Sequence, residues 1–347
     1  MTAFRRCPMS KKENALFWDT AHRYLDHQLK VIRQVSSNTI DSYRDSLNNF
    51  IDYLEQVEQI NRKKITLNSF ERETLKRYQE WMITGKKLAP KTCNLRMTAI
   101  RAFLEYAAQE YLWVMPIYTD ACTIVGVKTE NHAIEYFEPN EMTALLAAPS
   151  GNKKTDRRNQ MILVFLYDTA ARVSEARQVR VSDLHLGGEV PYVTLLGKGR
   201  KYRNIPLMEK TILHLRRYLM EFHGPDLKSD APLFYAKTHG QMHELSSDSL
   251  EKMIKRYAEK CRSEGLTMPD NVHCHMIRKT RAMDLYRERV PLTHIQQMLG
   301  HENISTTSGF YAFATLDVLA KAIDAANPDE GVKAWSDPVT LEKLYRL

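Results

Sequence analysis

The chain has 347 residues, of which 43% are hydrophobic and 27% charged, and its net charge is +8. This length allows about two domains and a core large enough to fold without disulfides or a structural metal. The longest clean apolar run, Met161–Tyr167, is far shorter than the roughly 20 residues that span a bilayer. The first ten residues also lack the apolar region of a secretory signal, so we expect a cytoplasmic protein with no membrane partner.

The net charge and the cysteines limit which partners, cross-links and metal sites the protein can have. Residues 1–110 carry a net charge of +6 and residues 111–347 a net charge of +2, which favours a polyanion partner for the first third of the chain. A solvated basic surface without a partner explains that charge equally well. The five cysteines are scattered, and His273-Cys274-His275 has no second cluster to complete a tetrahedral site. We therefore expect no disulfides, no metal and no cofactor.

Residues 12–112 are predicted to form a bundle of four short amphipathic helices. Apolar residues recur at helical spacing from Tyr43 to Leu54, a helix follows around residues 70–84, and another begins near Pro90 with Leu95 and Phe103 on its apolar face. Basic residues precede this last helix and lie along it. They form a plausible surface for a DNA backbone, although such residues are most often just solvated: Lys86, Lys87, Lys91, Arg96 and Arg101.

Residues 113–135 are predicted to be a linker because helical periodicity fades there. A second domain is expected over residues 136–326, beginning with a helix at Pro139. A buried helix over 159–167 and a second helix near Arg172 follow. Residues 190–207 alternate in the manner of a β-hairpin, with a turn at Gly197–Arg200. Further helices are expected over 211–222, 247–265, 277–289 and 292–299, and residues 327–347 form a tail with a leucine stripe at Leu341, Leu344 and Leu347.

Four local features contain residues suited to chemistry on a phosphodiester. They are Thr169–Ala176 with Arg172 and Glu175, Lys198 in the hairpin turn, Cys274–Thr280 with His275 and Arg278 three residues apart, and Leu299–Ala312 with His301 and Tyr311. Taken singly, each has an ordinary structural explanation, such as a helix cap or a surface pair. Together, two arginines, a lysine, two histidines and a tyrosine form a set that can bind and attack a phosphate.

These features, in this order, resemble the tyrosine recombinase, or phage integrase, family, and in particular its Xer-like and mobile-element site-specific recombinases. The family patterns are R-x-S-E, G-K-G-x-K-x-R-x-x-P-L, H-x-x-R, and L-G-H followed by S-T-T and a tyrosine. They are matched here by Arg172–Glu175, Gly197–Leu207, His275–Arg278 and Leu299–Tyr311. Ser36–Leu54 and Ala89–Ala107 resemble the family's core-binding domain, and the likeness extends over residues 14–325.

The resemblance implies a mainly α fold with a small β-sheet. A SAM-like helical core-binding domain would be followed by an α+β catalytic domain over residues 136–326. It further implies a cytoplasmic, nucleoid-associated enzyme that cuts and rejoins double-stranded DNA through a 3′-phosphotyrosyl bond, for integration or excision of a mobile element or a related rearrangement. The resemblance also implies that the reaction needs no metal and no ATP. Arg200 and Lys201, beside the hairpin lysine, are added to the expected DNA contacts.

The resemblance also assigns roles to the residues of the catalytic set. Tyr311 is the expected nucleophile, Arg172 and Arg278 would bind the non-bridging phosphate oxygens, and Glu175 would hold Arg172 or His275 in place. The remaining roles are a hydrogen bond to the same phosphate from His301, protonation of the leaving 5′-oxygen by Lys198, and general acid–base assistance from His275.

One spacing departs from the family, and one expectation concerns assembly. The tyrosine normally follows the L-G-H histidine by nine residues, where Phe310 stands, whereas Tyr311 is the tenth. Gly309 tolerates the unusual backbone angles that would absorb the extra residue.

Family members act as homo-tetramers on two DNA sites, and are monomers or dimers when free. The 327–347 tail would dock on a neighbouring protomer or, almost equally, on its own domain.

Two other functions fit parts of the same pattern. A type IB topoisomerase-like enzyme would share the phosphotyrosyl chemistry, but the N-terminal core-binding domain argues against it. A non-catalytic DNA-binding relative is favoured only by the shifted tyrosine, and the otherwise complete set of catalytic residues argues against it.

Overall fold

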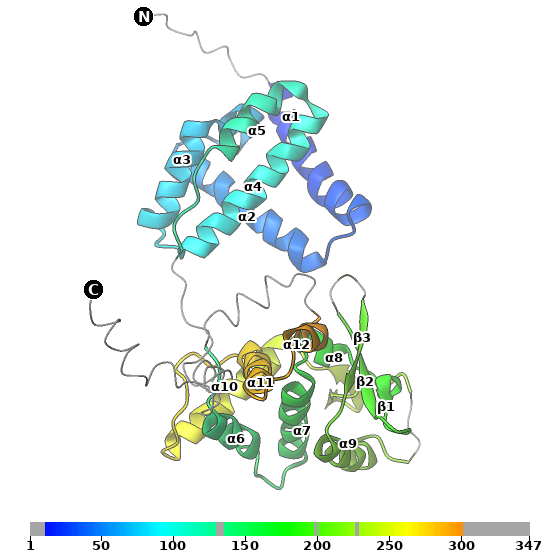
Figure 1. The fold of residues 1–347 in the computed structure, drawn as a ribbon. Coiled ribbons are helices and arrows are strands. Elements are labelled where there is room, and N and C mark those ends of the chain that lie inside the picture. Colours follow the sequence, from blue (N-terminus) through cyan, green and yellow to red (C-terminus); the bar gives the residue numbers. More distant parts are fainter. Residues whose placement is uncertain (1–10, 130–134, 198, 200, 226–228, 301–347) are drawn as a thin grey trace, which may run out of the picture. The chain divides into compact units, whose positions relative to one another are not determined.

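The computed structural model describes residues 11–129, 135–197, 199, 201–225 and 229–300 (Figure 1). Contacts divide the chain into two compact units, residues 1–132 and 133–347. Most described residues are helical and the strands are few and short, so the expected mainly α fold with a small sheet is confirmed. No helix in the described ranges is both long and apolar enough to cross a membrane.

Unit 1 is a helical bundle. Its helices are α1 (Lys11–His22) continued by η1 (Arg23–Ile32), α2 (Ser37–Gln56), α3 (Arg72–Glu80) continued by η4 (Trp81–Gly85), α4 (Pro90–Glu110) and α5 (Met115–Cys122), with short turns η2 (Arg62–Lys64), η3 (Leu67–Phe70) and η5 (Leu112–Val114). Residues with strong local preferences start the longest two helices. The Ser36 hydroxyl accepts a hydrogen bond from the Thr39 amide at 3.3 Å, and Pro90 occupies the first turn of α4, where its missing N–H costs nothing.

Aromatic side chains form the centre of unit 1. Phe17, Phe50, Phe70 and Phe103 are all fully buried. The ring of Phe70 lies 4.6 Å from that of Phe50, 5.7 Å from that of Phe17 and 5.6 Å from that of Phe103, centroid to centroid. These spacings are those of favourable edge and tilted ring pairs. The rings come from α1, α2, η3 and α4, so this cluster joins most of the bundle.

The predicted linker over residues 113–135 is wrong for its first half. Residues 115–122 form α5, which packs on α4, and polar side chains of α4 fasten the chain beyond it. The Arg101 guanidinium donates to the carbonyls of Ala121 and Ile124 at 3.0 and 2.6 Å, and the Asn94 side chain pairs with both main-chain groups of Val127 at 2.8 Å. A segment held through its backbone needs no apolar periodicity, and this is why the sequence pattern missed it.

Unit 2 is built around one central helix. Its helices are α6 (Pro139–Ala147), α7 (Lys154–Thr169), α8 (Val173–Gln178), α9 (Glu209–Phe222), α10 (Ser247–Ser263), α11 (Cys274–Arg287) and α12 (Leu292–Leu299), with the turn η6 (Val181–Asp183). The helix α7 packs against α6, α8, α9 and α11 (Figure 1). Every helix predicted for this domain is present, and the bounds of α12 are those predicted.

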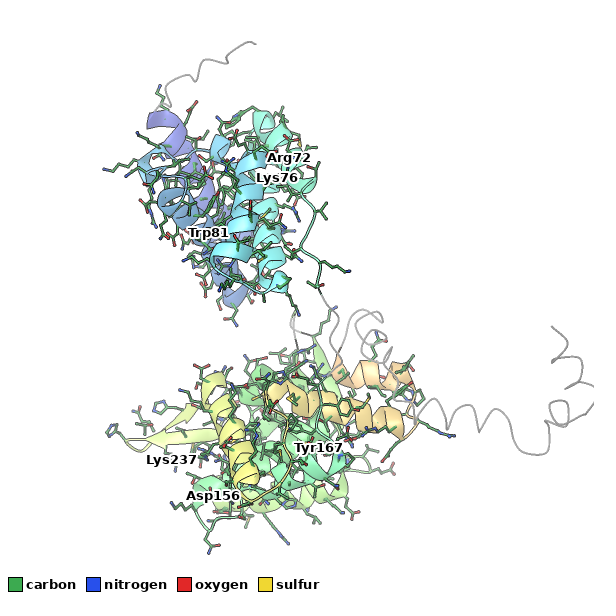
Figure 2. All side chains as sticks on the ribbon, turned by 90° about the vertical axis from the view of Figure 1, so that its left-hand side faces the viewer. Arg72, Lys76, Trp81, Asp156, Tyr167 and Lys237 are labelled. Carbon is green, nitrogen blue, oxygen red and sulfur yellow. The ribbon has the colours of Figure 1, made fainter. Side chains whose placement is uncertain are left out.

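Two antiparallel sheets complete unit 2. The strands β1 (Leu184–His185), β2 (Tyr192–Leu196) and β3 (Tyr202–Pro206) form one sheet in that order, with Thr194 opposite Asn204. The predicted hairpin is therefore confirmed, and its inward residues Val193, Leu195 and Ile205 are buried. A second hairpin, β4 (Tyr235–Thr238) and β5 (Gln241–Glu244), projects from the unit at Lys237 (Figure 2). It was not predicted, since all of β5 is exposed and it lacks the alternation of a buried strand.

Two alanine substitutions on α4 distinguish the core of unit 1 from its surface. Phe103→Ala removes a ring that contacts three others, so the free energy of unfolding should fall by about 3–5 kcal/mol. Leu95 lies on the same helix but is 58% exposed, contrary to its predicted place on the apolar face. Leu95→Ala should therefore leave stability almost unchanged. Urea denaturation followed by circular dichroism measures both variants, and an equal loss in the two would contradict this core.

Candidate active site

The R-x-S-E segment lies where α7 ends and α8 begins. Ala170 ends α7 with φ of 48°, a left-handed conformation that is uncommon for a residue with a side chain. The chain then becomes extended at Arg172, which is the N-cap of α8. The Arg172 amide donates to Glu175 Oε2 at 2.7 Å, so the carboxylate caps the helix at whose start the arginine lies. The spacing of three residues between them is the spacing that a helix cap requires.

The carboxylate of Glu175 is the centre of the site. It is 3% exposed and accepts from Arg172 Nη1 at 2.7 Å. Arg203 donates to it from both ends of its guanidinium, Nη1 to Oε1 at 2.9 Å and Nη2 to Oε2 at 2.7 Å. Arg278 Nη1 lies 3.9 Å from Oε2. The expectation that Glu175 holds Arg172 agrees with these contacts.

Arg278 reaches the site from the middle of α11 and is almost fully buried. Its Nη1 donates to the carbonyl of Ala170 at 2.7 Å, and its Nη2 donates to the carbonyl of Leu299 at the end of α12. The left-handed turn at Ala170 thus presents the carbonyl that fixes this arginine. Two of the four predicted features, R-x-S-E and H-x-x-R, are brought together here, and Leu299, the first residue of the L-G-H feature, contacts them through its carbonyl.

Three guanidinium groups around one carboxylate leave an excess of positive charge. Burial raises the pKa of Glu175, but its bonds to Arg203 and Arg172 outweigh burial and hold the pKa below its ordinary value. The carboxylate is therefore ionised at neutral pH and balances only one of the three arginines. A local excess of guanidinium charge, in the fork geometry that matches phosphate oxygens, favours binding of an anion.

His275 is a neutral imidazole beside these cations. It lies in the first turn of α11, and its side chain is solvent-accessible. Desolvation by the surrounding protein, together with the charges of Arg278, Lys279, His273 and Arg172, lowers its pKa to about 4. At neutral pH the ring therefore carries a free lone pair and is able to accept a proton, as a general base requires.

The other residues of His273-Cys274-His275 have structural surroundings. His273 Nδ1 accepts from the Met276 amide at 3.2 Å and so caps α11, while Cys274 is buried and its amide donates to Glu251 at 3.0 Å. Burial raises the pKa of the Cys274 thiol. Within the described ranges no three His, Cys, Asp or Glu side chains are grouped as metal ligands would be.

Several predicted residues lie outside the described ranges. These are Lys198, Arg200, His301, Tyr311 and the leucines of the 327–347 tail. The structure nevertheless describes residues next to three of them, Lys198, Arg200 and His301. Gly197 and Lys201 close the hairpin through a 2.8 Å hydrogen bond, and Gly300 directly precedes His301.

The basic residues predicted to contact DNA divide into two groups. Lys86 and Lys87 are exposed in the turn between η4 and α4, and Lys86 lies 5.1 Å from the centre of the Trp81 ring. Lys91 is exposed in the first turn of α4, where the helix N-terminus adds positive potential. Lys201 is exposed beside the hairpin turn. In contrast, Arg96 and Arg101 are half-buried, and Arg101 uses its guanidinium on the carbonyls beyond α5. Exposure thus supports a phosphate-contacting role for the lysines more than for these two arginines.

Arg203 is a residue of this site that the sequence reasoning did not single out. It is the arginine of the matched G-K-G-x-K-x-R-x-x-P-L pattern and lies on β3. No local signal shows that its partner is Glu175, 28 residues earlier in the chain. The pattern itself, which places an arginine five residues after Lys198, was the only available signal.

Comparison with known proteins identifies the same two parts of the chain. The Phage integrase family matches residues 135–315, and the N-terminal SAM-like domain of phage integrases matches residues 22–111. The tyrosine recombinase XerC of Staphylococcus saprophyticus is 30% identical over 303 residues, which are 87% of this chain and 95% of the relative.

Solved structures share the fold. The XerH site-specific recombinase in a post-cleavage complex with palindromic difH substrate has a TM-score of 0.66 at 22% identity, over 84% of this chain and 81% of that one. The Tn1549 transposon integrase in complex with a circular intermediate DNA has a TM-score of 0.63 at 20% identity, over 88% of this chain and 99% of that one.

The low pKa of His275 predicts how the protein responds to acid. In the folded chain the imidazole should stay neutral until the pH falls to about 4, whereas its ordinary pKa is 6.5. Because the unfolded chain takes up this proton first, folding stability should fall as the pH drops from 6.5 toward 4. NMR titration of the histidine rings measures the pKa, with His275→Asn to assign the resonance. An inflection near 6.5 for that ring would contradict the prediction.

Proposed function

The chain belongs to the phage integrase family of tyrosine recombinases and is a site-specific recombinase, and from this premise we propose how its residues cut and rejoin DNA. The observation that carries the proposal is the cluster of Arg172, Arg203 and Arg278 around the single carboxylate of Glu175. A DNA phosphate is the anion that would complete this charge balance. The substrate is double-stranded DNA.

Arg172 and Arg278 bind the scissile phosphate in this proposal. They come from two different elements, α8 and α11, so a phosphate between them would contact two rigid supports rather than one flexible loop. Charge develops on the non-bridging oxygens as the phosphorus becomes pentacoordinate. Guanidinium groups already held in position stabilise that charge without reorganising.

His275 and Tyr311 carry out the nucleophilic step. A phenol with an ordinary pKa of about 10 is mostly protonated at neutral pH and needs a proton acceptor. His275 is neutral, and the negative charge of a bound phosphate would raise its pKa from about 4 toward its ordinary value. The Tyr311 oxygen attacks phosphorus as His275 takes the phenol proton. The bond between phosphorus and the 5′-oxygen breaks, and Lys198 gives a proton to that leaving oxygen. Attack by that hydroxyl on the phosphotyrosine reverses each bond change and rejoins the strand.

His301 and the exposed lysines complete the assignment. His301 would donate a hydrogen bond to the same phosphate, since it follows Gly300 next to the arginine cluster. Lys86, Lys87 and Lys91 would contact the backbone phosphates of the recognised site. Such contacts supply affinity and register rather than sequence specificity.

The assembly and the biological role belong to the same proposal. The active form would be a homo-tetramer that holds two DNA sites, with residues 327–347 docked between protomers through the Leu341, Leu344 and Leu347 stripe. The role would be integration or excision of a mobile element or a related rearrangement of DNA. The Tn1549 transposon integrase, whose fold the chain shares, is an integrase of that kind.

A covalent-trapping experiment tests the nucleophile. Nicked duplexes from the flanks of the protein's own coding locus are mixed with it in EDTA, and adducts that survive SDS are scored. The wild type should form an adduct and Tyr311→Phe should form none, because phenylalanine has no oxygen to attack phosphorus. An adduct from Tyr311→Phe would show that the nucleophile lies elsewhere. Gel-shift binding by both proteins without any adduct would favour a non-catalytic DNA-binding protein.

Salt dependence tests the lysine surface. If Lys91 contacts one phosphate, Lys91→Ala should reduce the slope of log affinity against log salt by about 1. Lys76→Ala is the matched control, because Lys76 also lies on unit 1 but is already paired with Glu73 at 2.9 Å. The control should keep the wild-type slope. Equal slopes for all three proteins would remove Lys91 from the DNA-binding surface.

A further inference from the structure

Arg203 bonds to residues of two other elements of unit 2 through a single guanidinium. It lies on β3 opposite Leu195, and its side chain is 10% exposed. Both of its Nη atoms donate to Glu175, and its Nε donates to the carbonyl of Met298 at 2.9 Å. One guanidinium therefore joins β3, α8 and the end of α12.

The end of α12 is bound by three arginines in succession. Arg203 takes the carbonyl of Met298, Arg278 that of Leu299, and Arg172 that of Gly300 at 3.4 Å. The last carbonyls of a helix have no partners within it and carry the negative end of its dipole, so guanidinium donors are well suited to them. The same three arginines surround Glu175. The carboxylate and the helix end together fix all three.

The glycines of two motifs leave the space that Arg203 fills. A Cβ on Gly197 would lie 3.3 Å from Arg203 Nη1, and a Cβ on Gly300 would lie 3.2 Å from the same atom. Gly300 also has φ of +61°, which disfavours any residue with a side chain. Both glycines therefore allow the motifs that contain them to approach one guanidinium closely.

We propose that Arg203 is a positioning residue for DNA cleavage, one that sets the Glu175 carboxylate and the end of α12 so that the phosphate-binding arginines are held in their reactive arrangement. This inference rests on the proposed function. Arg203 acts through Glu175 on Arg172, and through Met298 on the chain that leads to His301. It makes no contact with substrate itself.

The electrostatics of Glu175 give this role a signature. Groups facing the carboxylate are Arg172, Arg203 and Arg278. Burial raises the pKa of Glu175, and the hydrogen bonds from Arg203 are the largest of the interactions that lower it. Loss of Arg203 should therefore raise the pKa of Glu175. A protonated Glu175 no longer holds Arg172 by charge, so the cleavage rate of the variant should decline at a higher pH than that of the wild type.

The test compares the full chain with two substitutions and one matched control. Arg203→Lys keeps the charge but cannot donate to both carboxylate oxygens and to Met298, and Arg203→Ala removes every bond. Arg157→Lys is the control, because Arg157 also forks onto a glutamate, Glu221, and donates to the carbonyl of Asn152, at a place away from the cluster. The substrate is the nicked duplex that gives an adduct with the wild type.

Three quantities are measured on each variant: the single-turnover rate of adduct formation between pH 5 and 8, the gel-shift affinity for the same duplex, and the melting temperature. We expect the rate to fall about 10-fold for Arg203→Lys and about 100-fold for Arg203→Ala, since small displacements of catalytic groups cost rates of this order. DNA affinity should change less than about 2-fold, and the acid limb of the rate profile should move to higher pH. Arg157→Lys should match the wild type in rate and in pH profile.

The outcomes are separable. If Arg203→Lys remains folded and cleaves as fast as the wild type, or if affinity and rate fall together with an unmoved acid limb, the positioning role is wrong. If the rate falls equally in Arg157→Lys, general loss of stability explains the effect and the role is again wrong. If neither the wild type nor the control forms an adduct with DNA that it binds, the proposed function itself fails, and the role of Arg203 fails with it.

Discussion

The site depends on one buried carboxylate. An isolated ionised glutamate at 3% exposure would be strongly destabilised, so Glu175 requires the arginines that surround it. Those arginines repel one another and require the carboxylate in turn. Elements far apart in the chain therefore have to meet at one point for these buried charges to be stable. The charge balance that permits folding is also what leaves the excess of positive charge for an anion.

That excess connects the stability of the site to its chemistry. The arginines that would bind a phosphate also contribute to keeping His275 neutral. Their positive charges lower its pKa, because a further positive charge beside them is unfavourable. In our proposal the scissile phosphate would add negative charge next to the ring. This charge would raise the pKa of His275 and make the imidazole a better proton acceptor when substrate is present. The same interaction that binds the phosphate in our proposal prepares the group that accepts the proton from Tyr311.

The sequence predicted those features that depend on local pattern. The helices at Pro139 and at residues 292–299 follow from cap residues and apolar spacing, and the hairpin follows from alternation around Gly197–Arg200. Features that depend on distant partners were missed. The helix α5 and the chain after it are held by Arg101 and Asn94 from α4, and Arg203 finds Glu175 across 28 residues. No window of sequence contains both members of such a pair.

Net charge in the sequence also overstates the charge available to DNA. Arg62 pairs with Asp52 and Glu55, Arg77 pairs with Glu58, and Arg101 binds main-chain carbonyls, so these arginines serve the fold of unit 1. The planar guanidinium is suited to such fixed, multiple bonds, whereas the ammonium of lysine is strongly hydrated and remains outside. Lys86, Lys87 and Lys91 have no carboxylate partner among the ion pairs of the described residues. The basic surface of unit 1 that is free of such pairs is thus narrower than the +6 charge of residues 1–110 suggests, and it includes the lysines at and just before the start of α4.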